Sequence, residues 1–165
     1  MSQAPSGFDP SLFLDAQQNE VNTKRPPLPV ENPAAADGLY TAVIGTVTTD
    51  AGTIGKGDRA GQAWMSFVVP LKIDVPQQLQ DALKLPPTVQ LTDRVFADLT
   101  ADGKGLDNAP GRNRGQRLYR DALDLNKPGD VWTWRKAEGG VVKVKVTHEM
   151  YNNEPVERVA GVFKR

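Results

Sequence analysis

Hydrophobic and polar residues alternate along several short segments of the chain, and this alternation predicts a β-rich protein. It is clearest late in the chain, where Val142, Val144 and Val146 fall on one face and Lys143 and Lys145 on the other. Successive side chains of a strand point to opposite faces, so the pattern is typical of a strand with one buried face. In chain order, we expect strands over residues 39–48, 64–73, 88–100, 141–150 and 156–163, with a turn at Asn152-Asn153 in the last hairpin.

Apolar residues at helical spacing predict a helix from about residue 113 to residue 125, ended by Pro128-Gly129. Three further elements are expected: a short helix over residues 77–84, a long mobile hairpin loop over residues 50–61, and a short strand that carries Trp132 and Trp134 on one face. Three strands, a helix and a closing hairpin follow the chain order of an OB-type five-stranded barrel. We therefore expect a mainly β fold of this type, and a small sandwich with one helix is the main alternative.

The first 37 residues differ in composition from the rest, because six of the 13 prolines fall there. Lys24 to Val30 should be extended, close to polyproline II. Asp9 and Pro10 are suited to cap and begin a short helical turn. We expect an extended arm over residues 1–37 and a β-barrel domain over residues 38–165. A disordered tail and an arm that binds a neighbouring molecule both stay open; in the second case the contacts would come from Phe8, Phe13, Leu14, Pro26, Pro27 and Leu28.

Charge and composition narrow the classes of function. The chain has 20 basic and 20 acidic residues, so its formal net charge is zero, whereas dedicated nucleic-acid binders usually carry a basic excess. It has no cysteine, which excludes disulfides, thiolate metal sites and cysteine nucleophiles. No secretion signal is visible, and no segment approaches the roughly 20 apolar residues of a membrane span. We expect a soluble protein with no membrane partner.

The residues that could support catalysis each lack a required companion. His148 is the only histidine, and nothing in the sequence supplies a partner for acid–base work. Asp98, Asp102 and Asp107 share a glycine-rich loop, but Lys104 and Leu106 interrupt any calcium-loop register, so a solvated turn is expected. The glycines of the 50–61 loop lack the ending of a phosphate-binding P-loop. We expect no enzymatic activity, cofactor, metal or small-molecule substrate.

Two clusters of basic residues are candidates for nucleic-acid binding. The first is Arg112, Arg114 and Arg117 at the start of the predicted helix, where guanidinium groups suit phosphate contacts. A solvated helix face that pairs with Asp121 explains the same residues. The second cluster is Lys143 and Lys145 on the polar face of the penultimate strand. The rings available for stacking against bases are Trp64, Phe96, Trp132 and Trp134, and most of these should lie in the core.

The chain also resembles a group of small tailed-bacteriophage proteins. The resemblance covers about residues 8–163 and rests on these segments: Phe8–Leu14, Gly38–Ile44, Asp98–Thr100, Arg117-Leu118, Ala122-Leu123, Pro128-Gly129, Val142–Val146 and Val159–Val162. It implies an OB-like β-barrel, and some members of the group are single-stranded-DNA-binding proteins. Phage single-strand binders commonly end in an acidic tail, whereas this chain ends in Lys164-Arg165.

Two classes of function remain. The first is a non-enzymatic virion protein, a capsid cement or decoration protein on the capsid surface, which would strap neighbouring capsid subunits with its arm and self-associate, as a trimer by analogy. The neutral charge and the apolar arm favour it. The alternative is a phage single-stranded-DNA-binding protein of OB fold, acting in replication or recombination in the host cytoplasm. The strand order and the two basic clusters favour that alternative.

Overall fold

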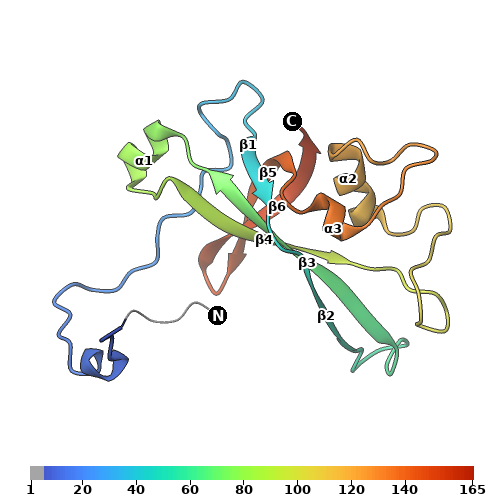
Figure 1. The fold of residues 1–165 in the computed structure, drawn as a ribbon, viewed down its shortest axis with the longest axis horizontal. Helices are drawn as coiled ribbons and strands as arrows, with labels where there is room; N and C mark the ends of the chain where they lie inside the picture. Colours follow the sequence, from blue (N-terminus) through green and yellow to red (C-terminus); the bar gives the residue numbers. More distant parts are fainter. Residues whose placement is uncertain (1–5) are drawn as a thin grey trace.

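A single antiparallel sheet organises the protein, as shown in Figure 1 by a computed structural model that describes residues 6–165. Its six strands are β1 (Tyr40–Ile44), β2 (Thr48–Thr53), β3 (Ala63–Asp74), β4 (Thr88–Phe96), β5 (Val141–Tyr151) and β6 (Glu154–Lys164). The strands are ordered β2-β3-β1-β5-β6, and β4 pairs with the remaining edge of β3. The mainly β prediction is therefore confirmed. The sheet is not closed, because β4 and β6 do not pair within the described residues.

The long strand β3 has two partners on one edge. β2 pairs with its first half and β1 with Leu71 to Ile73, so the expected single strand over residues 39–48 is in fact two strands. Between them, the backbone N–H of Gly45 donates to the carbonyl oxygen of Pro70 over 2.8 Å. β2 also occupies part of the predicted 50–61 loop. That loop prediction was wrong there because β2 is polar and exposed, so no apolar alternation marks it as a strand.

The helices agree with the sequence prediction only in part. α1 (Gln77–Leu83) and α2 (Arg114–Ala122) form where expected, and α2 ends earlier than residue 125. Its buried residues are Tyr119 and Ala122, whereas Leu118 is exposed. α2 lies against β4 and β6 at the open seam of the sheet, where a Cβ on Gly115 would come within 2.7 Å of Val95.

The predicted strand around the last two tryptophans was wrong. Trp134 begins a one-turn helix, α3 (Trp134–Ala137), because the Thr133 side chain caps it by accepting the Lys136 backbone N–H. The ring of Trp134 is buried between Phe67 and Tyr119, with ring centroids 5.1 Å away in each case. The tryptophan therefore belongs to the core, beneath β3 and α2.

The core is formed largely by β-branched side chains on the inner face of the sheet. The alternation predicted for β5 is confirmed, since Val142, Val144 and Val146 are fully buried. Lys143 and Lys145 project from the opposite face, and a bulge follows between Lys145 and Val146. The turn at Asn152-Asn153 is also confirmed, with both residues at positive φ.

The expected arm divides into two parts. Its first five residues, 1–5, lie outside the described residues. The turn η1 (Pro10–Phe13) is capped by Asp9 as predicted, although it is a 3-10 helix, and it lies away from the sheet in Figure 1. Leu28, in contrast, is fully buried in the core. The tight packing against the sheet therefore begins well before the predicted boundary at residue 38.

Two residues of the last hairpin hold Leu28 in place. Glu157 of β6 accepts the backbone N–H of Leu28 over 2.9 Å and also pairs with Arg25. The imidazole Nε2 of His148 on β5 lies 2.6 Å from the Leu28 carbonyl oxygen. The single histidine thus has a structural partner in the arm.

Candidate functional site

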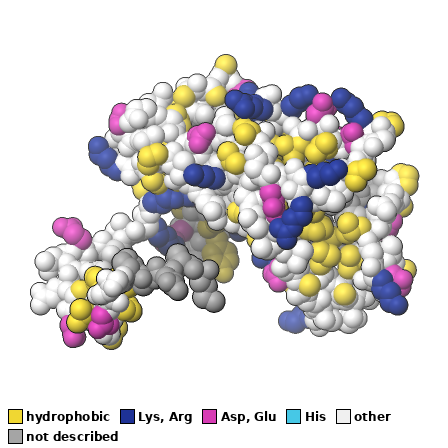
Figure 2. Space-filling model, viewed as in Figure 1, with side chains coloured by type: hydrophobic (Ala, Val, Ile, Leu, Met, Phe, Trp, Pro, Cys, Tyr) yellow, Lys and Arg dark blue, Asp and Glu magenta, His cyan; other side chains and the backbone are white. Residues whose placement is uncertain are grey.

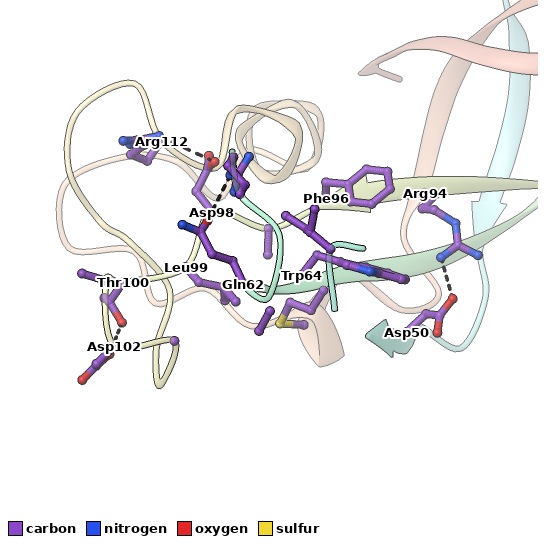
Figure 3. A pocket seen from close by; sticks show the side chains of 17 residues that line it. Asp50, Gln62, Trp64, Arg94, Phe96, Asp98, Leu99, Thr100, Asp102 and Arg112 are labelled. Atoms are coloured by element: carbon purple, nitrogen blue, oxygen red, sulfur yellow. Dashed lines mark hydrogen bonds and ion pairs between the residues drawn. The ribbon is translucent and has the colours of Figure 1, made fainter. Parts of the chain in front are cut away.

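A groove of about 1300 Å³ lies between the β2–β3 hairpin and the loop that follows β4 (Figure 3). The hairpin contributes Asp50, Arg59 and Gln62, and the centre of the groove is formed by side chains of β3 and β4. The loop over residues 97–103 and Arg112 complete the far wall. We call this feature the hairpin groove. In Figure 2, hydrophobic side chains gather over the β2–β3 hairpin, with basic side chains around them.

Two aromatic rings form the centre of the hairpin groove. Ser66 of β3 lies opposite Phe96 of β4, so the side chain of Trp64, two residues earlier on β3, emerges on the same face of the sheet as Phe96. The Trp64 and Phe96 ring centroids are 6.0 Å apart, with an angle of 58° between the planes. Phe96 is 61% exposed. The groove thus presents an aromatic surface to solvent.

A glycine on β2 makes room for the indole. Gly52 lies opposite Trp64 in the β2–β3 register, and a Cβ there would come within 2.8 Å of the indole Nε1. Such a distance is shorter than any normal non-bonded contact. The indole can therefore lie across β2 only because residue 52 has no side chain.

One arginine flanks the aromatic pair on the strand side. Arg94 is two residues before Phe96 on β4 and shares its face. Its Nη1 donates to the Asp50 carboxylate over 2.7 Å and to the Ser66 hydroxyl over 3.0 Å. The bond from Arg94 lowers the pKa of the Asp50 carboxyl. Ser66 is fully buried, and the bond from Arg94 gives its hydroxyl a hydrogen-bond partner.

Two more guanidinium groups lie at the ends of the groove. Arg59 in the hairpin donates from Nε to the side-chain oxygen of Gln62 over 3.1 Å. Arg112, before α2, lies 3.4 Å from an Asp107 carboxylate oxygen and 3.9 Å from one of Asp98. The groove therefore combines aromatic rings with three cations, and carboxylates already pair with two of these.

The wall that carries Arg112 is fixed by Asn113. Its side-chain oxygen accepts the Asp98 backbone N–H over 2.9 Å, and its own backbone N–H donates to the Asp98 carboxylate over 2.6 Å. Its amide nitrogen donates to the Asp107 carbonyl oxygen over 2.9 Å. The predicted solvated turn is present at Asp102, which is exposed, but Asp98 has a structural role as part of this clamp.

The structure brings only one of the predicted basic residues into the groove, namely Arg112. Arg117 pairs with Asp121 along α2 at 3.3 Å, as expected for a solvated helix face, and Arg114 is exposed on the same helix. Lys143 pairs with Asp37 at 2.7 Å. Lys145 is exposed on β5 and makes no ion pair with any described residue. These four side chains do not line the groove as the structure describes it.

The arm residues predicted to contact a partner also separate into groups. Phe8, Phe13 and Leu14 are exposed around η1, and Leu14 is 85% exposed. Pro26 is exposed and Pro27 partly buried, whereas Leu28 contacts its own domain. The exposed apolar side chains of Phe8, Phe13 and Leu14 are thus available to contact another molecule, whereas Leu28 is not.

Sequence reasoning named both rings of the groove but missed Gly52, Asp50, Arg59 and Arg94. Arg94 and Phe96 are two residues apart on one predicted strand, as are Trp64 and Ser66 on another, which signals a shared face. The missing information was the register between strands. Without β2 as a recognised strand, nothing placed Gly52 and Asp50 beside them.

Charge is segregated along the chain. All 20 basic residues lie between Lys24 and Arg165 together with 17 of the 20 acidic ones, so this part carries a formal charge of +3. The first 23 residues contain Asp9, Asp15 and Glu20 and no basic residue. The neutral total therefore arises from a basic body and an acidic arm.

Within residues 6–165, no three His, Cys, Asp or Glu side chains gather in a way that could hold a metal ion. No helix in that range has the length and hydrophobicity to cross a membrane. Compared with known proteins, the chain matches no protein-family model and shows no significant similarity to a curated protein.

Proposed function

We propose that the protein binds single-stranded DNA in the hairpin groove. The observation that carries this proposal is the pair of exposed Phe96 and half-buried Trp64, flanked by three arginines. Proteins that bind single strands combine aromatic rings, on which bases stack, with cations that contact the phosphates. Each stacked base contributes about 1–3 kcal/mol in such sites.

The connectivity of the sheet supports an OB-type assignment as part of this proposal. β1 and β2 follow one another along the same edge of β3 and act together as one strand bent at Gly45. With that pair counted once, the order is three strands, α2 and the β5–β6 hairpin, which is the OB order. OB folds bind oligonucleotides on the face of their second and third strands, beside the loop between the first two. The hairpin groove occupies the equivalent position.

The segregated charge removes the main objection to this proposal. Sequence-independent binding depends on phosphate electrostatics, for which a neutral protein is poorly suited. The body that carries the groove has a formal charge of +3, and the acidic residues that offset it lie in the arm. In Figure 2 the arm, at the lower left, shows acidic and hydrophobic side chains.

The test is the binding of a labelled oligo(dT) of about 16 nucleotides, a length within the usual range for one OB fold. We expect a fluorescence anisotropy increase that weakens steeply with salt. Phe96→Ala should weaken binding by about 5- to 150-fold, from the loss of one stacking ring. Tyr151→Ala is the matched control, because Tyr151 is 67% exposed but lies at the tip of the β5–β6 hairpin. Equal binding by Phe96→Ala and the wild type would refute the groove as the site.

A capsid cement protein remains the second candidate, favoured by a different observation. The side chains of Phe8, Leu12, Phe13 and Leu14 are exposed together on the arm. A large apolar cluster in solvent is typical of a surface that another protein covers. In this hypothesis the arm binds neighbouring capsid subunits, and the protein is found at stoichiometric copy number in purified particles. Mass spectrometry of such particles tests it, and deletion of residues 1–23 should release the protein.

A further inference from the structure

The hairpin groove contains its own anions beside the guanidinium groups that would contact phosphate. Asp50, on β2, is paired with Arg94 at 2.7 Å, and both side chains are about half exposed. Asp98 and Asp107 lie beside Arg112. An incoming phosphate therefore meets cations that carboxylates already neutralise in part. The three carboxylates differ, however, in what else they do.

Asp98 and Asp107 hold the loop in place. The Asp98 carboxylate accepts the backbone N–H of Asn113, and the Asp107 carboxylate accepts that of Ala109. Asp50 has no comparable role in the part of the chain that the structure describes, since its one other hydrogen bond there is accepted from the backbone N–H of the adjacent Ala51. Asp50 is thus the one carboxylate of the three whose charge can be removed without opening the loop.

We propose that Asp50 is a built-in competitor of phosphate at Arg94, which sets how tightly the groove holds single-stranded DNA. The inference rests on the proposed function. A phosphate that approaches Arg94 must either displace the Asp50 carboxylate or bind beside it against its charge. Exposed ion pairs are weak, so phosphate can displace the Asp50 carboxylate at little cost in free energy. That cost still lowers the affinity of the groove for single-stranded DNA.

The geometry predicts that removal of this charge does not misplace Arg94. The same Nη1 also donates to the Ser66 hydroxyl at 3.0 Å, and the β3–β4 register fixes the backbone beneath it. In Asp50→Asn, the amide oxygen can still accept from Arg94. That substitution therefore separates the charge of residue 50 from its hydrogen bond.

The experiment measures oligo(dT) affinity for the wild-type chain and for Asp50→Asn over a range of salt concentrations. We expect Asp50→Asn to bind roughly two- to fivefold more tightly, the size of an exposed ion-pair effect. The decrease of affinity with salt should also be steeper, because Arg94 is no longer neutralised within the protein.

The matched control is Asp121→Asn. Asp121 pairs with Arg117 on α2 at 3.3 Å, so the substitution changes the net charge equally and frees an arginine that does not line the groove. Asp50→Asn should also have no effect in an Arg94→Ala background, because the two residues act as a pair. Coupling in this cycle is the signature of competition at Arg94.

The outcomes distinguish the two proposals. If the wild type binds oligo(dT) but Asp50→Asn binds more weakly, Asp50 positions Arg94 and the competitor inference is wrong. If Asp121→Asn tightens binding as much as Asp50→Asn, the effect is one of net charge and the inference is also wrong. If neither the wild type nor Asp50→Asn binds, the proposed function itself fails, and the role of Asp50 falls with it.

Discussion

The indole of Trp64 lies across the backbone of Gly52 on the neighbouring strand, so closely that a Cβ at position 52 would come within 2.8 Å of its nitrogen. This contact orients one of the two rings in the hairpin groove. It also couples an exposed edge strand to the candidate site. The glycine is therefore a positioning residue for the aromatic surface.

Replacement of this glycine should move the indole. We expect Gly52→Ala to shift the Trp64 indole N–H cross peak in a nitrogen–proton NMR spectrum and to weaken oligo(dT) binding. Crowding of this kind lowers the free energy of unfolding by about 1–3 kcal/mol where neighbouring atoms cannot move, and by less if the indole changes rotamer. Gly55→Ala is the control, because nothing lies within 4 Å of its Cβ position. An unmoved Trp64 cross peak in Gly52→Ala would contradict the contact.

The pair formed by Asp93 and Tyr119 gives a pH-dependent prediction. The Tyr119 hydroxyl donates to the Asp93 carboxylate over 2.7 Å beneath α2. Burial raises the pKa of Asp93 above its ordinary value of 3.8, and the bond from Tyr119 opposes that rise. With a raised pKa, the folded state holds the proton more tightly than the unfolded chain. The stability that Asp93 contributes at low pH is thus lost as the pH rises from about 3.8 through the folded pKa.

Tyr119→Phe removes the bond that lowers this pKa. We expect the NMR titration midpoint of the Asp93 carboxyl to rise further. The free energy of unfolding at pH 7 should fall by about 1–3 kcal/mol, because a partly buried carboxylate loses its donor. Tyr151→Phe, at an exposed position, should change neither quantity. An Asp93 midpoint that is the same in Tyr119→Phe and the wild type would rule out this account.

The buried position of Leu28 predicts where the chain can be shortened. Deletion of residues 1–23 should leave the thermal unfolding midpoint nearly unchanged, since the exposed η1 segment makes no core contact. Deletion of residues 1–36 removes Leu28 and its bonds to Glu157 and His148. The contribution of the Leu28 side chain can also be tested without a deletion. Leu28→Ala should lower the free energy of unfolding by about 2–5 kcal/mol.

Leu14→Ala is the control for that substitution, as Leu14 is exposed on the arm. Calorimetry of the four variants gives the comparison. Similar unfolding midpoints for the two deletions would show that Leu28 does not belong to the cooperative core.

Asn113 should control the order of the loop that carries Arg112. Its backbone has φ +52° and its side chain makes three hydrogen bonds across the loop. Asn113→Gly keeps the backbone conformation accessible but removes those bonds. We expect the free energy of unfolding to fall by about 1–3 kcal/mol and trypsin to cleave faster after Lys104 and Arg112. Asn153→Gly, at a similar φ in an exposed turn, should be neutral. Equal cleavage rates in these two variants would contradict the clamp.

The sequence predicts most elements of this fold because their signals are local. Valine alternation identifies β5, proline and glycine residues bound α1 and α2, and Asn152-Asn153 places the final turn. β2 was missed because it is an exposed edge strand with no buried face, and edge pairing is a property of the neighbouring strand. Trp134 was misassigned because the capping bond that Thr133 accepts from Lys136 outweighed the β propensity of the aromatic pair.

The candidate site was less accessible to prediction than the fold. The basic residues that are adjacent in sequence, Arg112 to Arg117, point to different surroundings. Strand pairing brings together groove residues that are far apart in the sequence, and Arg94 and Asp50 are one example. The local signals were the two-residue spacings of Arg94 and Phe96 on one strand and of Trp64 and Ser66 on another. The rest required the register between β2, β3 and β4.

The double pairing of β3 has a consequence for native-state hydrogen exchange. β4 covers one edge of this strand, and β2 and β1 share the other, with the Gly45 bond to Pro70 between them. Its amide protons can reach solvent only when a neighbouring strand separates, so those near Val69 and Leu71 should exchange through global unfolding. β2 has one partner and an exposed face, and its amides should exchange through local opening. The hairpin that forms the groove would then join the slowest and the fastest exchanging strands of the sheet.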